Sequence, residues 1–300
     1  MHISSITRRT MSLLAVAAGV LAGLAACSPL TALNALSPAN GATTTSDIAY
    51  GTGARLKLDV YRPATVAPGA PVVVFFYGGN WNSGGRKDYA FVGRALAARG
   101  IVAVIPDYRL YPQVRYPDFL DDAAQAVAWT TRNIASYGGN TASVFVMGHS
   151  AGAYNAAMVA LDTRWLGKQG LAPGVLAGWI GLAGPYDFLP ITNEETKPVF
   201  HFPATPVDSQ PVNHVNGSKL PALLIAANTD TLVNPARNTG GMAQRLRARG
   251  VTVTEIYYDG VSHTTLVGSL ASPLRGLAPT LEAIDQFVHA NASLSKVQAM

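Results

Sequence analysis

The sequence predicts an α/β fold, in which a mostly parallel central sheet carries helices on both faces. Runs of continuous apolar residues alternate with helix-type segments along the chain, as in parallel sheets that are covered on both sides. Hydrophobic residues make up 49% of the 300 residues and charged residues only 13%, which allows a large core. Because the length suits one domain and no internal repeat is visible, we expect a single α/β unit with a small irregular insertion.

The predicted elements follow in a regular order. An alternating segment at 56–61 predicts the first strand. Continuous apolar runs then predict buried strands at 71–77, 101–105, 143–147, 177–182 and 221–227, and a further strand is expected at 251–258. Between them, helices are predicted at 89–99, 117–137, 151–162, 235–249 and 279–290, several of them bounded by Gly or Pro.

Residues 187–219 interrupt this rhythm. The segment is rich in proline and shows little hydrophobic periodicity. One interpretation is an insertion over the carboxyl edge of the sheet, where a lid or substrate wall belongs. The alternative is a long surface loop without a role in binding.

The N-terminal residues 1–26 are typical of an export signal and are excluded from the predicted fold. Arg8 and Arg9 precede an apolar run, Met11 to Ala25, that is too short for a comfortable membrane span. The run ends in Leu24-Ala25-Ala26-Cys27, which resembles a bacterial lipobox. That resemblance implies lipidation of Cys27 after cleavage. The alternative is an ordinary secretory peptide that leaves Cys27 as a free thiol.

The predicted organisation is therefore a lipoprotein signal peptide at 1–26, a flexible tether at 27–46 and one α/β domain at 47–300. The tether is expected because Ala, Ser, Thr, Pro and Gly dominate that segment. We expect an exported protein that is held on a membrane of the cell envelope by the lipid at Cys27, with Sec or twin-arginine export left open. Cys27 is the only cysteine, so no internal disulfide is possible.

The charge pattern argues against two classes of partner. The formal net charge is +5, and Arg8 and Arg9 account for two of these charges. Because the remaining Lys and Arg are scattered, the sequence shows no nucleic-acid patch and no basic membrane-binding patch. It also contains no H-x-x-H or H-E-x-x-H pairing, so no metal site is expected.

The motif that carries chemistry is Gly148-His149-Ser150-Ala151-Gly152, a G-x-S-x-G element. It follows a predicted buried strand and precedes an alanine-rich predicted helix. This context places a serine hydroxyl at the tip of a strained turn, with the next amide aimed at an oxyanion. We therefore predict Ser150 as a nucleophile and the Ala151 N–H as one oxyanion donor.

A serine hydroxyl needs a base, and that base needs an orienting acid. His263 is the predicted base because it follows the last predicted strand in a polar loop, whereas His149 lies inside the turn and should point away from the partner of the hydroxyl. Asp230 is the predicted acid because it follows the strand at 221–227. Its alternative role is a turn or cap residue, and Asp259 is its rival.

The remaining oxyanion donors should come from a turn after an early strand. Tyr77-Gly78-Gly79-Asn80-Trp81 occupies that place, and glycines allow the backbone to approach a substrate carbonyl. We predict Gly79 and Asn80 as amide donors. Trp81 is either a wall of the acyl pocket or a packing residue.

Together these motifs resemble the α/β-hydrolase superfamily, and within it the esterases of the hormone-sensitive-lipase, feruloyl-esterase and kynurenine-formamidase type. The matching pieces include Leu58-Asp59-Val60-Tyr61 and Pro106-Asp107-Tyr108-Arg109-Leu110, and all occur in the family's order between about residues 50 and 265. One departure is Tyr77, which stands where the family usually has a histidine that braces the oxyanion loop.

The resemblance implies hydrolysis of small-molecule carboxylic esters, short-chain or aryl, through an acyl-enzyme on Ser150 and without a cofactor. An amidase, formamidase or acyltransferase with the same triad is the alternative, because these activities differ in pocket shape and water access. A non-catalytic binding protein on the envelope is a further alternative from another class.

Overall fold

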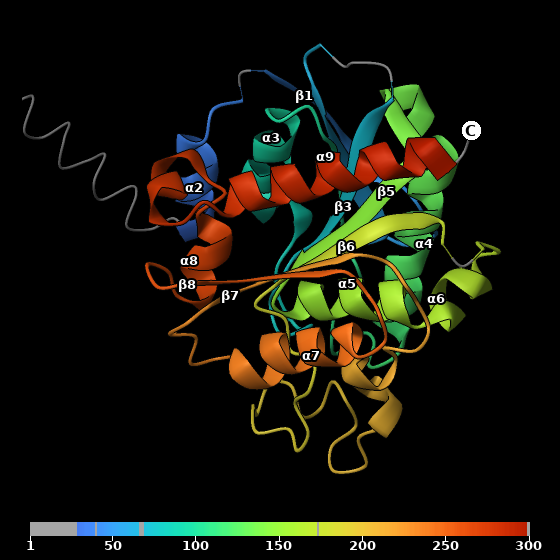
Figure 1. Ribbon diagram of the computed structural model, residues 1–300, viewed down its shortest axis with the longest axis vertical. Coiled ribbons are helices and arrows are strands. Elements are labelled where there is room, and N and C mark those ends of the chain that lie inside the picture. Colours follow the sequence, from blue (N-terminus) through green and yellow to red (C-terminus); the bar gives the residue numbers. More distant parts are fainter. Residues whose placement is uncertain (1–28, 40, 66–68, 173, 299–300) are drawn as a thin grey trace, which may run out of the picture.

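Eight strands form one mixed sheet through the centre of the described chain (Figure 1). The computed structural model describes residues 29–298 except 40, 66–68 and 173, with side chains as far as residue 292. The strand order is β1-β2-β4-β3-β5-β6-β7-β8. Strand β2 is antiparallel to both β1 and β4, and all other neighbouring pairs are parallel. The strands are β1 (Ala42–Ala49), β2 (Lys57–Pro63), β3 (Ala70–Phe76), β4 (Val102–Pro106), β5 (Gly139–His149), β6 (Leu176–Leu182), β7 (Ala222–Ala227) and β8 (Val253–Tyr258).

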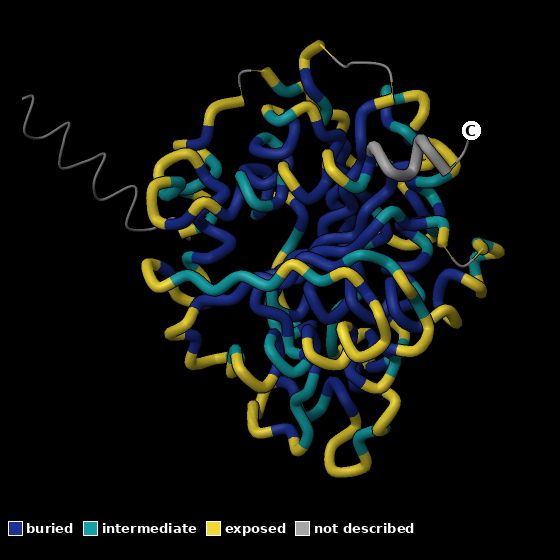
Figure 2. The backbone as a smooth tube through the Cα atoms, in the orientation of Figure 1, coloured by how far each residue is buried: buried dark blue, intermediate teal, exposed yellow. Residues whose placement is uncertain are grey.

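Burial explains why the central strands are continuous apolar runs. Every residue of β3, β4 and β7 is buried, and Figure 2 shows this interior in dark blue beneath exposed loops. Because helices cover both faces, neither side of these strands meets water. The edge strands β1 and β8 are more exposed, which agrees with their mixed composition.

The helices pack in two layers. Helices α3 and α9 contact each other on one face, while α4, α5 and α6 contact one another on the other face (Figure 1). The α-helices are α2 (Pro29–Leu36), α3 (Ala90–Ala97), α4 (Asp118–Asn133), α5 (Ala151–Leu161), α6 (Thr163–Lys168), α7 (Gly241–Arg247), α8 (His263–Gly268) and α9 (Thr280–Gln298). The predicted mostly parallel α/β fold is confirmed.

Some boundaries differ from the prediction. The expected helix at 117–137 ends as an α-helix at Asn133 and continues as a 3₁₀ turn, Ile134–Tyr137. The expected helix at 235–249 opens with a π-helical turn, Ala236–Gly240. Helix α9 extends to Gln298, beyond the predicted end. Helix ends are set by tertiary packing as much as by local sequence, so such shifts are expected.

The predicted flexible tether is wrong for the described part of 27–46, because helix α2 and strand β1 occupy it. Asn34 on α2 accepts a hydrogen bond from the Phe91 N–H at 2.8 Å and donates to the Lys87 carbonyl at 2.9 Å. The threonine-rich start of β1 pairs with β2. Composition alone missed these elements because their partners are distant in sequence. Residues 1–26 and Cys27 lie outside the described residues.

Two further observations concern the outside of the domain. Among the described residues, no helix is both long and apolar enough to cross a membrane. The 187–219 segment is irregular, with short 3₁₀ turns at Val207–Ser209 and Pro211–Asn213, and it forms the yellow and gold loops at the bottom of Figure 1.

Candidate active site

Ser150 lies on a strained turn between β5 and α5. Its φ is 54° and its ψ is −123°, a backbone conformation that costs a non-glycine residue free energy and recurs at functional sites. A Cβ on Gly148 would lie 2.1 Å from the Gly152 carbonyl oxygen, and a Cβ on Gly152 would lie 2.0 Å from that of Phe76. Both glycines are therefore required for the turn, which explains the G-x-S-x-G spacing physically.

The structure brings Asp230 and His263 together. The His263 Nδ1 atom lies 2.7 Å from the Asp230 Oδ2 atom, and the contact is buried. Asp230 follows β7, and its Oδ1 accepts backbone hydrogen bonds from Leu232 and Val233, each at 2.9 Å. Its side chain therefore serves as a turn acceptor and as a histidine partner at the same time. Because a carboxylate only accepts, the imidazole donates from Nδ1 and Nε2 remains free to take a proton.

The structure corrects the predicted position of His263 and decides between the two candidate acids. His263 is the first residue of helix α8 rather than a loop residue, because Ser262 caps that helix in a capping box with Thr265. The rival Asp259 instead accepts a hydrogen bond from Asn228 Nδ2 at 2.6 Å. Of the two acids considered, Asp230 is therefore the one that contacts the imidazole.

The electrostatics of Asp230 favour its ionised form. Burial raises the pKa of its carboxyl, but the hydrogen bonds from His263 and from the backbone N–H groups of Val233 and Leu232 outweigh burial. The net result is a pKa below the ordinary 3.8. Asp230 is thus a carboxylate at neutral pH, as an orienting group for an imidazole must be.

His149 does not point away from the site, contrary to the sequence-based expectation. Its Nε2–H donates to the backbone carbonyl of His263 at 2.9 Å, and the two ring centroids are 4.9 Å apart. Burial, followed by the nearby His263, lowers the pKa of His149 to about 3, so it is neutral at physiological pH. The residue before the nucleophile therefore connects the turn directly to the histidine loop.

No hydrogen bond joins the Ser150 hydroxyl to the His263 ring among the described residues. Hydrogen bonds between a nucleophile and its base are often long without substrate and tighten in the reacting complex. The contact of His149 with the His263 carbonyl nevertheless fixes the two segments next to each other.

The loop after β3, residues 77–85, packs directly against the nucleophile, and we call it the oxyanion loop. A Cβ on Gly78 would lie 3.0 Å from the Ser150 Cβ. Gly79 has φ of 129°, and a Cβ there would lie 2.4 Å from the Ser83 carbonyl oxygen, so only glycine fits. Asn80 and Trp81 follow with φ of 48° and 57°. The structure thus places the predicted donor segment beside Ser150, with its backbone in a conformation that is costly for side-chain-bearing residues.

Trp81 is 2% exposed and fixed on several sides. Its indole N–H donates to Asn155 Oδ1 at 3.0 Å, and its ring meets Tyr154 and Phe200 edge-on at centroid distances of 5.1 and 4.8 Å. It also lines the cavity beside Ser150. Trp81 therefore packs against neighbouring side chains and also lines the cavity beside Ser150.

A cavity of about 110 Å³ opens beside the nucleophile. Its lining contains no charged side chain and consists of Asn80, Trp81, Ser150, Ala151, Pro185, Phe188, Ile191, Thr192, Asn193, Thr196, Leu232 and Val233. Several of these residues belong to the 187–219 segment, so that segment forms a wall of the pocket. Glu195 on the same segment accepts a hydrogen bond from the Asn80 side-chain amide at 2.9 Å.

Sequence reasoning missed His149, Asn155 and Glu195 as supports of the site. His149 was visible within the motif, but its direction depends on where the histidine loop folds. Asn155 and Glu195 have no local signal, because each contacts the oxyanion loop from more than 70 residues away along the chain.

A larger cavity, of about 750 Å³, lies at the opposite end of the strands. It is lined by the starts of β5 and β6 and by the segment leading into β7. Lys219 is its one charged lining residue among those described, and its amine donates to the Arg249 carbonyl. The described residues also contain no group of three or more His, Cys, Asp or Glu side chains that could hold a metal ion. The chemistry-bearing residues are therefore concentrated at the carboxyl end of the sheet.

The chain is similar to several known proteins. A rice (Oryza sativa subsp. japonica) protein described as a probable isoprenylcysteine alpha-carbonyl methylesterase is 30% identical over 250 residues, which cover 76% of this chain and 58% of that protein. A kynurenine formamidase from Salmo salar is 26% identical over 251 residues, covering 83% and 76%. A crystal structure of a mutant of the esterase rPPE superposes with a TM-score of 0.68 at 26% identity, covering 89% and 87%.

A family model matches most of the site described above, but not His263. The chain spans just over half the length of the rice relative. The BD-FAE family model matches residues 58–243, which include the oxyanion loop, the Ser150 turn and Asp230. The mostly parallel sheet with helices on both faces agrees with the superposition on the esterase structure, and the fold is that of the α/β-hydrolases. On these grounds, the chain belongs to the BD-FAE family.

Proposed function

We propose that this protein is a serine carboxylesterase that cleaves short-chain or aryl esters through an acyl-enzyme on Ser150. The observation that carries the proposal is the 2.7 Å hydrogen bond between His263 Nδ1 and Asp230 Oδ2, at the same end of the sheet as the Ser150 turn. Its family membership and its esterase relatives support the same reaction class.

The reaction begins with proton transfer from the Ser150 hydroxyl to His263 Nε2. The serine oxygen attacks the ester carbonyl, and Asp230 stabilises the imidazolium that forms. His263 then protonates the leaving alcohol as the tetrahedral intermediate collapses to the acyl-enzyme. Water, deprotonated by the same imidazole, hydrolyses the acyl-enzyme and regenerates the serine.

The negative charge of the tetrahedral intermediate needs donors that are in place beforehand. The Ala151 N–H at the start of α5 and the Gly79 and Asn80 amides of the oxyanion loop fill this role in our proposal. Each such donor typically contributes about 3–4 kcal/mol to lowering the barrier.

The pocket supports a short acyl group. Its volume of about 110 Å³ is well below the roughly 300–1,000 Å³ typical of sites for drug-sized ligands. Because no charged side chain lines it, a neutral acyl group is favoured over an ionised one. We therefore expect turnover to fall as the acyl chain of a p-nitrophenyl ester lengthens beyond a few carbons.

The decisive test compares the wild-type protein with Ser150→Ala on p-nitrophenyl butyrate and with a fluorophosphonate probe. We expect the wild type to turn over the ester and take up the probe, and the variant to do neither while keeping its circular dichroism spectrum. Ester turnover that survives in Ser150→Ala would contradict the proposal. An unlabelled, inactive wild type would instead favour a binding protein.

A formamidase activity of the same site is the second candidate, because a kynurenine formamidase is among the relatives. The two activities share the triad and the oxyanion donors, so the ratio of turnover on an N-formyl amide and on an ester of similar size separates them. An acyltransferase would reveal itself by forming a new ester when a competing alcohol is added.

We also propose that Cys27 is lipidated and holds the protein on the envelope. The proposal rests on the Leu24-Ala25-Ala26-Cys27 segment and the basic, apolar residues before it. The test is fractionation of cells that express the full chain. Wild-type protein should stay with the membranes, whereas Cys27→Ser should leave them. Equal membrane association of both would refute lipid anchoring at this residue.

A further inference from the structure

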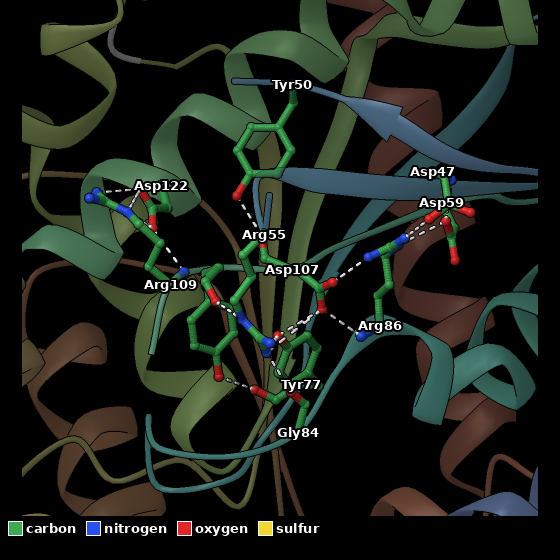
Figure 3. Close-up of polar contacts among 11 residues, drawn as sticks. Asp47, Tyr50, Arg55, Asp59, Tyr77, Gly84, Arg86, Asp107, Arg109 and Asp122 are labelled. Carbon is green, nitrogen blue, oxygen red and sulfur yellow. Dashed lines mark hydrogen bonds and ion pairs between the residues drawn. The ribbon is translucent and has the colours of Figure 1, made fainter. Parts of the chain in front are cut away.

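We infer that the Tyr77 hydroxyl, held between Arg55 and Asp107, is a positioning group that fixes the oxyanion loop for catalysis. The inference rests on the proposed esterase function and extends it to a residue that does not touch the substrate. Figure 3 shows Tyr77 beside Arg55 and Asp107, in a polar network that continues through Arg86 to Asp59 on β2.

Tyr77 is the first residue of the oxyanion loop and is fully buried. Its hydroxyl donates to Asp107 Oδ1 at 2.9 Å and accepts from an Arg55 Nη at 2.9 Å. The phenol is also stacked against Tyr108 and Tyr89, with ring centroids 4.8 and 5.6 Å away. Two hydrogen bonds to charged groups and two ring contacts therefore leave the side chain one position.

The same arginine also holds the far end of the loop. Arg55 donates to the carbonyl of Gly84 at 2.5 Å and, through Nε, to the carbonyl of Tyr108 at 2.7 Å. Tyr108 in turn donates its hydroxyl to the Tyr77 carbonyl at 2.8 Å. Arg55 and Tyr77 thus join both ends of residues 77–85, between which the Gly79 and Asn80 amides lie.

Asp107, which supports this arrangement, is itself held in place by Arg86. Its carboxylate accepts from the Arg86 N–H at 2.7 Å and pairs with the Arg86 guanidinium. Arg86 also binds Asp59 on β2 at 2.9 Å. Because Arg55 Nη2 and Asp107 Oδ1 are 4.0 Å apart, the phenol oxygen bridges a guanidinium and a carboxylate that have no direct hydrogen bond. Without it, Arg55 can move toward Asp107 and release the Gly84 carbonyl.

Burial and the neighbouring Asp107 raise the pKa of the Tyr77 hydroxyl well above 10. The phenol therefore stays protonated across the working range of an esterase and remains a donor to Asp107. No proton leaves or enters this network during turnover, which separates positioning from acid–base catalysis.

The test measures kcat and KM of Tyr77→Phe on p-nitrophenyl butyrate, together with inhibition by an alkylboronic acid that forms a tetrahedral adduct on the serine. We expect kcat to fall about tenfold, because small displacements of positioned groups have effects of this order or larger. Boronate affinity should fall by a similar factor, while KM stays within about twofold, since the loop donors act on the tetrahedral state.

Tyr50→Phe is the matched control. Tyr50 is a buried tyrosine whose hydroxyl donates to the Asp107 backbone carbonyl, and in the part of the chain that the structure describes no hydrogen bond joins it to residues 77–85. It should lower thermal stability as Tyr77→Phe does and keep kcat within about twofold. If Tyr77→Phe retains wild-type kcat, or if both variants lose kcat equally, the positioning role is overturned.

A second variant covers the case in which Tyr77→Phe fails to fold. The Arg55 side chain is 31% exposed, so packing tolerates Arg55→Lys. A single ammonium group, however, does not reproduce the separate Nε and Nη positions from which Arg55 reaches Tyr108, Tyr77 and Gly84. A severalfold lower kcat with unchanged KM supports the inference, and an unchanged kcat refutes it. An inactive wild type refutes the proposed function itself, whereas an active wild type with unaffected variants refutes only the role of Tyr77.

Discussion

The two sides of the candidate site are held in place by different interactions. On one side, buried charges of Arg86, Asp59 and Asp107 support the oxyanion loop. On the other, the His263 segment is held by a bond to Asp230, a contact from His149, a hydrogen bond from the Thr229 hydroxyl to the Val261 carbonyl and a helix cap. The first arrangement is a network with several anchors, and the second is a short chain of single contacts.

This difference matches what each side must do. Oxyanion donors work best when they are fixed before the charge develops, because no reorganisation is then needed. The imidazole instead exchanges protons with the serine, the leaving group and water during one cycle. We therefore expect substitutions on the network side to reduce both stability and rate, and substitutions on the histidine side to reduce rate with little loss of fold.

Asp230→Asn should have the largest effect. The amide can still accept the Leu232 and Val233 N–H groups, so the turn survives, but it cannot stabilise an imidazolium. We expect kcat to fall by about 10³–10⁴-fold and unfolding to change little. Ester kinetics and denaturant unfolding of the same preparation measure both. An active Asp230→Asn variant would remove this residue from the site.

Arg86→Met tests the side of the oxyanion loop through the free energy of unfolding. Removing this cation leaves Asp59 and Asp107 buried without their partner, which typically costs about 3–5 kcal/mol. The control is Arg99→Met, because Arg99 also pairs with more than one acid, Glu282 and Asp285, but near the surface. That variant should lose at most about 1 kcal/mol. Equal losses in urea unfolding would show that burial does not distinguish the two arginines.

Gly79→Ala tests the oxyanion loop by adding a methyl group for which the loop has no room. The new Cβ would lie 2.4 Å from the Ser83 carbonyl oxygen at a φ that alanine avoids, so the loop must shift. We expect kcat to fall by about 10²–10³-fold, comparable to losing one oxyanion donor, with KM affected less. Gly100→Ala is the control, because its φ is also positive but no atom lies within 4 Å of its Cβ. A rate loss shared by both would point to a general destabilisation.

Substitution of His149 should have the smallest effect, a change in stability at acidic pH. Burial lowers its pKa to about 3 in the folded protein, against roughly 6.5 in the unfolded chain. The unfolded state therefore binds more protons between these values, so this contribution to stability is complete above about pH 6.5 and is lost as pH falls toward 3.

The expected slope for this one group is at most about 1.4 kcal/mol per pH unit. We expect the unfolding free energies of the wild type and His149→Gln to converge as the pH falls from 7 to 4, because Gln removes the proton-linked contribution of His149. Parallel curves for wild type and His149→Gln would show that His149 is not the titrating group.

Much of the fold could be predicted because the information is local. Continuous apolar runs identified the strands, and the two glycines around Ser150 identified a turn that tolerates no side chain. The order of Ser150, Asp230 and His263 along the chain indicated which loops would meet at the carboxyl ends of parallel strands. The helix and strand within the expected tether were missed because their partners, such as Phe91, lie far away in sequence.

The sequence by itself determined the central strands, the strained serine turn and the candidate nucleophile, base and acid, because periodicity and turn sterics act over a few residues. Only the tertiary structure decided that His149 contacts the histidine loop, that Glu195 meets Asn80, and that Tyr77 bridges Arg55 and Asp107. Those contacts depend on side-chain directions between segments that are far apart in the chain. A one-dimensional pattern does not contain that information.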